Sequence, residues 1–97
     1  MLKIYKVNKE ANGKVQGFIS KDAFARNGYI YREGKTLGIE GDEYYLYIEG
    51  EESFFKEQDE SLSIEGVQEM DGDDFEKVKE AIEKEQGDVA SGISLFD

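Results

Sequence analysis

The stretch DDFEKVKEAIEKEQ, residues 73–86, decides how the fold is interpreted. Its apolar residues Phe75, Val78 and Ile82 recur at the three- and four-residue spacing of one helical face, and charged residues fill most positions between them. Gly87 follows, and glycine is the usual residue just past a helix end. We therefore expect one C-terminal helix that ends at Gly87 and packs its apolar stripe against a sheet.

Upstream of this helix, apolar residues alternate in short runs that glycine turns separate. The clearest run is YYLYIE, residues 44–49, which predicts a strand with side chains on two opposite faces. Asn12-Gly13 is a strong hairpin signal between two further runs. Residues 21–26 fit a one-turn helix or a strand, and the sequence leaves both open. The expected strands cover residues 2–7, 14–20, 29–32, 36–40, 44–49, 53–58 and 62–67.

Together these elements predict an α+β fold, an antiparallel meander of six to seven short strands, bent or partly closed, with one C-terminal helix on its open side. A chain of 97 residues is near the commonest size of one domain, so we expect residues 1–97 to form a single domain. In topology alone, the meander ending in a helix resembles the pleckstrin-homology-like superfold. The tryptophan usual in that family's helix is missing, because this chain has none.

Composition excludes several kinds of chemistry. The chain has neither Cys nor His, which rules out disulfides, thiolate nucleophiles, imidazole bases and the usual transition-metal ligands. No feature identifies an enzyme, and we expect no cofactor. No apolar run approaches the roughly 18 to 20 residues of a membrane span, and the start MLKIYKV lacks the core of a secretion signal. We therefore expect a cytoplasmic protein that does not contact membranes.

The net charge of −11 is unevenly distributed along the chain. Residues 1–35 hold eight Lys or Arg and three acids, a charge of +5, whereas residues 36–97 hold four Lys and twenty acids, a charge of −16. Such a field repels nucleic acid and anionic membranes as a whole. A cationic partner, or one that meets only the N-terminal third, is easier to accommodate.

The tyrosines of the expected strands are the first candidate binding residues. If Leu46 and Ile48 face the core, their neighbours on the same strand look outward. Together with nearby cationic side chains, such tyrosines could form a stacking surface for bases or sugars; a sheet covered on both faces is the alternative. The candidates are Tyr29, Tyr31, Arg32, Tyr45 and Tyr47.

Acidic residues around the start of the helix are the second candidate. Carboxylates within one turn offer the oxygen ligands that Ca²⁺ or Mg²⁺ prefers, although no EF-hand spacing is present. A helix cap explains the same residues without a metal, because acids near a helix N-terminus complement its dipole. The candidates are Asp71, Asp73, Asp74 and Glu76.

The C-terminal peptide, residues 88–97, is the third candidate and is expected to be a flexible tail, to dock, or to add an edge strand. Its apolar residues Ile93, Leu95 and Phe96 make it a candidate contact for a protein partner. The leading interpretation is a non-enzymatic protein-interaction or adaptor module, with a protein partner that includes a second copy of the chain, by sheet edge or tail. The alternatives are a divalent-cation binder and a single-stranded nucleic-acid binder, and nucleic acid is the less favoured partner.

Overall fold

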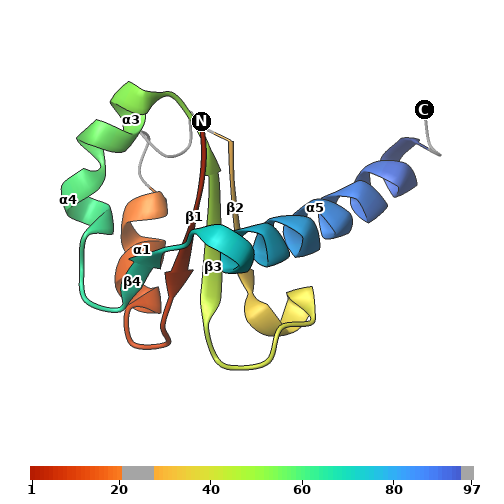
Figure 1. The fold of residues 1–97 in the computed structure, drawn as a ribbon, viewed down its shortest axis with the longest axis horizontal. Coiled ribbons are helices and arrows are strands. Elements are labelled where there is room, and N and C mark those ends of the chain that lie inside the picture. Colours follow the sequence, from red (N-terminus) through yellow and green to blue (C-terminus); the bar gives the residue numbers. More distant parts are fainter. Residues whose placement is uncertain (21–27, 95–97) are drawn as a thin grey trace.

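The described part of the chain forms a four-stranded antiparallel sheet with helices on both faces (Figure 1). The computed structural model describes residues 1–20 and 28–94, with side chains through residue 85. In chain order, the described elements are β1 (Leu2–Val7), α1 (Asn12–Ile19), β2 (Gly28–Glu33), the 3-10 helix η1 (Gly34–Leu37), β3 (Tyr44–Glu49), α3 (Glu52–Glu57), α4 (Asp59–Leu62), β4 (Val67–Glu69) and α5 (Gly72–Ser94).

The strand order across the sheet is β2-β3-β1-β4, and all three pairings are antiparallel. The first strand of the chain is therefore interior, and β2 and β4 are the outer strands. In the register, Leu46 of β3 lies opposite Tyr5 of β1 on one side and opposite Tyr31 of β2 on the other. Because side chains alternate along a strand, β1, β2 and β3 each contribute to two separate cores.

The first core lies between the sheet and helices α1, α3 and α4. It contains Tyr5, Val7, Leu46 and Ile48 from the strands, with partly buried Tyr31 and Tyr44 at its side. The helices contribute the buried residues Ala11, Val15, Ile19, Phe54, Phe55 and Leu62. This layer therefore holds the three α-helices α1, α3 and α4.

The second core lies on the opposite face, which α5 covers together with Leu37 of η1 and Ile39. Ile82 and Ile4 are fully buried there, with Val78 and Tyr45 beside them and Phe75 packed at the margin. Figure 1 shows α5 crossing the front of the sheet and continuing past β2. The prediction that Phe75, Val78 and Ile82 form one ridge against the sheet is confirmed.

The prediction of a meander of six to seven strands with a single helix is wrong, although the α+β class with an antiparallel sheet is confirmed. Three of the expected strands, over residues 2–7, 29–32 and 44–49, are present in β1, β2 and β3. The sheet is covered on both faces, so the partly closed shape implied by the pleckstrin-homology-like resemblance is also wrong. The expectation for residues 21–26 lies outside the described residues.

The expected hairpin at Asn12-Gly13 is the start of helix α1. The apolar residues Ala11, Val15 and Ile19 recur every four residues and are all buried, which is the spacing of one helical face. The side chain of Asn8 precedes the helix, and its Oδ1 accepts a hydrogen bond from the Ala11 amide at 2.8 Å. Helical spacing therefore outweighs the local turn signal.

The other missing strands are short helices or turns. Phe54 and Phe55 lie within helix α3 and are both buried in the first core, whereas consecutive residues of a strand point to opposite faces of the sheet. Residues 36–40 fall in η1 and the following turn, where Gly38 has a φ of 76°. Strand β4, Val67–Glu69, shares only Val67 with the last expected run, residues 62–67. Helix α5 passes through Gly87, where we expected it to end, and continues to Ser94.

Candidate functional site

The structure separates the candidate tyrosines onto two faces of the sheet. Tyr45 is only 4% exposed and lies in the core under α5, and the Tyr47 hydroxyl donates to Glu83 Oε2 of α5 at 3.4 Å. Burial raises the pKa of Tyr45, with smaller contributions from the charges of Glu43 and Asp74. Both tyrosines therefore face a helix, so the expectation that they look outward is wrong.

Tyr31 packs on the opposite face. Its ring stacks on Tyr44 with centroids 5.6 Å apart, and its hydroxyl donates to Asn12 Oδ1 at 2.7 Å. Burial, followed by the influence of Tyr44, raises the Tyr31 pKa well above its usual value. Tyr29 is 37% exposed and points to the same face of β2 as Tyr31. The expected tyrosines therefore do not form one stacking surface.

Arg32, the remaining candidate of this group, connects β2 to α5. Its Nε lies 2.8 Å from Glu85 Oε1, and its Nη1 donates to the main-chain carbonyl of Tyr31 at 3.0 Å. The other carboxylate oxygen, Glu85 Oε2, is buried and has no hydrogen-bond partner among the described residues. Glu85 is 53 residues away in sequence, and no local sequence signal identifies it.

The acidic candidates stay apart in the structure. The side chains of Asp71, Asp73, Asp74 and Glu76 are exposed. Among the residues that the structure describes, no three carboxylates gather where they could hold a metal ion. The arrangement therefore fits the start of a solvated helix, in which the amide of Phe75 donates to the Asp71 carbonyl.

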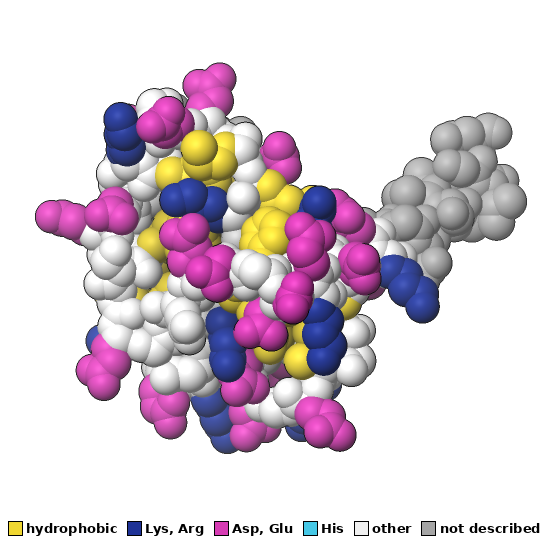
Figure 2. All heavy atoms as spheres, in the orientation of Figure 1, with side chains coloured by type: hydrophobic (Ala, Val, Ile, Leu, Met, Phe, Trp, Pro, Cys, Tyr) yellow, Lys and Arg dark blue, Asp and Glu magenta, His cyan; other side chains and the backbone are white. Residues whose placement is uncertain are grey.

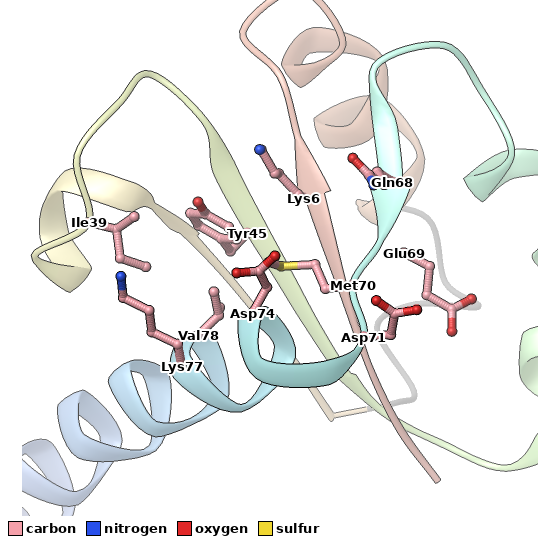
Figure 3. Close-up of a pocket in the computed structure, with 10 residues that line it drawn as sticks. All are labelled: Lys6, Ile39, Tyr45, Gln68, Glu69, Met70, Asp71, Asp74, Lys77 and Val78. Carbon is pink, nitrogen blue, oxygen red and sulfur yellow. The ribbon is translucent and has the colours of Figure 1, made fainter.

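A hollow of about 240 Å³ lies where the first turn of α5 meets β1, β3 and β4 (Figure 3). Lys6 and Lys77 bring positive charge to its wall, and Asp74 turns its carboxylate toward Tyr45. Lys6 Nζ is also 3.9 Å from Glu43. The hollow thus mixes both signs of charge, and the core of the described residues contains no buried polar or charged side chain.

The rest of the visible surface is strongly charged. Figure 2 shows Asp and Glu spread over this face, with Lys and Arg interleaved between small apolar areas. No helix of the described chain is both long enough and apolar enough to cross a membrane. Helices cover both faces of the sheet. In the described part of the chain, the backbone groups of the strands therefore reach the surface at the two edges of the sheet.

The outer edge of β2 presents backbone groups that do not pair with β3, although the side chains of Arg32 and Thr36 already donate to the Tyr31 and Glu33 carbonyls. In an antiparallel ladder, every second residue bonds to the neighbouring strand and the residues between them point away. The Gly34 amide donates to the Glu43 carbonyl at 2.9 Å at the end of the β2–β3 ladder. Arg32 therefore bonds to β3 as well, whereas Tyr31 and Glu33 turn their N–H and C=O groups to the outer edge. The bond from Arg32 Nη1 to the Tyr31 carbonyl agrees with this direction.

The opposite edge is much less suited to pairing. Strand β4 has three residues against six in β2, and its exposed residues Gln68 and Glu69 are followed by Asp71. Short and charged edge strands are a common protection against further pairing. Among the described strands, β2 is therefore the edge that can accept another strand.

The third group of candidates, at the C-terminus, is described only in part. Ile93 lies in helix α5, where only the backbone is described, and Leu95 and Phe96 lie outside the described residues. No protein-family model matches the chain, and no curated protein or solved structure shows a significant match. Its function is consequently argued from the geometry described above.

Proposed function

We propose that this chain is a non-enzymatic protein-interaction module that binds an extended segment of a protein partner as an additional strand at the β2 edge. The observation that carries the proposal is the outward direction of the Tyr31 and Glu33 backbone groups on a six-residue outer strand. Strand addition is a common mode of peptide recognition, in which main-chain hydrogen bonds supply most of the affinity.

The surroundings of the edge support this use. Each new backbone hydrogen bond contributes about 0.5 to 1.5 kcal/mol net, so several must form together along the strand. Strand β2 is anchored on both faces, because Tyr31 is stacked and hydrogen-bonded on one face and Arg32 pairs with Glu85 of α5 on the other. A pre-ordered edge lowers the entropic cost of binding.

Charge favours a cationic partner segment. The net charge of −11 attracts cations at a distance and accelerates their encounter, and the effect weakens in salt. The same field weakens binding of nucleic acid, whose affinity depends on phosphate contacts with Lys and Arg. We place the module in the cytoplasm, in keeping with a chain that contains no cysteine.

The test uses a fluorescent peptide of alternating threonine and lysine, seven residues long, and the substitution Glu33→Pro. Proline removes the outward N–H and its ring projects into the edge, yet its fixed φ matches the native φ of −68° at Glu33. We expect fluorescence anisotropy to detect binding to the native protein and at least a tenfold loss with Glu33→Pro.

The matched control is Glu52→Pro, which makes the same change of residue and charge at the first position of α3. Proline is well tolerated there, because that amide has no partner within the helix and the preceding Glu51 is extended, with ψ of 159°. The control protein should bind the peptide normally. Circular dichroism must show that the native protein and Glu33→Pro are both folded. If both then bind the peptide equally, the β2 edge is not the binding surface.

A further inference from the structure

Helix α5 extends well beyond the sheet that it covers. Its 23 residues span about 35 Å at 1.5 Å per residue, whereas four strands spaced about 4.8 Å apart are roughly 14 Å across. Glu85 already contacts Arg32 on the outermost strand. Residues 86–94 add roughly 13 Å of helix beyond Glu85, and Figure 1 shows α5 continuing past β2. This overhanging part of α5 would cover two or three strands added beside β2.

The overhanging segment differs from the rest of α5 in composition. Residues 72–85 contain nine charged residues, whereas residues 86–94, QGDVASGIS, contain only Asp88. A helix that is solvated on all sides normally carries charged and polar residues around its circumference. A charge-poor segment at the free edge of a sheet is therefore a candidate for coverage by another chain.

We propose that the occupant of the β2 edge is a second copy of this chain, which forms a symmetric dimer through antiparallel pairing of two β2 strands. The inference rests on the proposed use of the β2 edge and names its partner. A twofold axis through Tyr31 brings outward backbone groups of the two strands together and continues the sheet to eight strands. The two α5 helices then lie on the same face and run in opposite directions, so each overhang extends over the sheet of the other copy.

Charge and hydrogen bonding favour this edge for self-association. The chain repels its own copies over most of its surface, because its net charge is −11. Residues 28–37 are an exception, since Arg32 and Lys35 outnumber Glu33. In the register centred on Tyr31, Arg32 of one copy lies opposite Ile30 of the other, on the face that holds Glu85. The dimer therefore brings a second guanidinium to the side of the sheet where Glu85 Oε2 has no described partner.

Light scattering coupled to size-exclusion chromatography tests the dimer with the full-length protein. We expect twice the chain mass of 11.0 kDa for the native protein and for Glu52→Pro, and the monomer mass for Glu33→Pro. A folded Glu33→Pro protein that stays dimeric would place the interface elsewhere and overturn the proposal. A double substitution, Val89→Asp with Ile93→Asp, tests the overhang and should raise the dissociation constant at least tenfold.

The outcomes separate this inference from the proposed function. A native protein that is monomeric throughout, yet binds the threonine–lysine peptide through an edge that Glu33→Pro closes, overturns the dimer and keeps strand addition. A monomer that also ignores the peptide overturns both. A dimer that Glu33→Pro dissociates and the Val89 and Ile93 substitutions leave unchanged supports β2 pairing and removes the overhanging helix from the interface.

Discussion

The substitution Ile82→Ala measures how much of the fold depends on the contact between α5 and the sheet. Ile82 is fully buried against Ile4, Tyr45 and Val78 in the second core. Three carbons are removed, each of which contributes about 0.8 kcal/mol when transferred from water. The cavity left in a rigid sheet adds to this loss, so we expect the free energy of unfolding to fall by about 3 to 4 kcal/mol.

Urea denaturation followed by circular dichroism measures this difference directly. Lys84→Ala is the matched control, because Lys84 is exposed on the same helix and its loss should change stability by less than about 0.5 kcal/mol. The dependence of unfolding free energy on urea should stay unchanged if both variants unfold in two states. A loss below about 1 kcal/mol for Ile82→Ala would refute the packing of α5 against this face of the sheet.

Three further predictions test other parts of the structure. Burial, and to a smaller extent the charges of Glu69 and Asp59, raises the pKa of Tyr5 from 10.0 to about 12, because the folded state favours the neutral phenol. The free energy of unfolding should therefore be unchanged below pH 10 and fall as the pH rises toward 12. Tyrosinate absorbance and urea denaturation at increasing pH measure this change. Gly66→Ala should destabilise by about 1 to 3 kcal/mol, since φ is +91° and the new Cβ would lie 2.5 Å from Asn8 Oδ1; thermal unfolding that is unchanged would contradict this. Tyr31→Phe removes the hydrogen bond to Asn12 and should lower the unfolding free energy by about 1 kcal/mol in urea denaturation, and a neutral result would mean that solvent replaces the bond.

The sequence predicted an element correctly where its pattern of apolar residues was long and uninterrupted. Residues 44–49 alternate over a full strand, and Phe75 to Ile82 repeat the helical spacing over about two turns, so a strand and a helix were correctly predicted there. Residues 12–20 contain two glycines, which weakened the helical pattern that Ala11, Val15 and Ile19 define. The Asn-Gly pair then suggested a turn that the buried four-residue spacing overrides.

The sequence identified single residues of the candidate site but not the contacts between them. Arg32 was identified from its place beside tyrosines, but its role depends on Glu85, which the fold brings close from 53 residues away. Which residues of β2 face outward depends on the alternation of the ladder with β3, and sequence alternation alone does not define it. The two-sided cover of the sheet likewise required the positions of α1 and α5, which place Tyr45 in a core.

Arg32 gives the β2 edge a selectivity that an unguarded strand would lack. Its guanidinium bonds to the outward carbonyl of Tyr31 while Glu85 holds it in place, so part of the edge is satisfied when no partner is present. A carbonyl oxygen has two lone pairs, and an added strand can therefore share this acceptor rather than displace the arginine. Any segment that pairs here must also accommodate a cation and a carboxylate on one face of the sheet. A second copy meets this requirement, because it presents the same pair in the opposite direction.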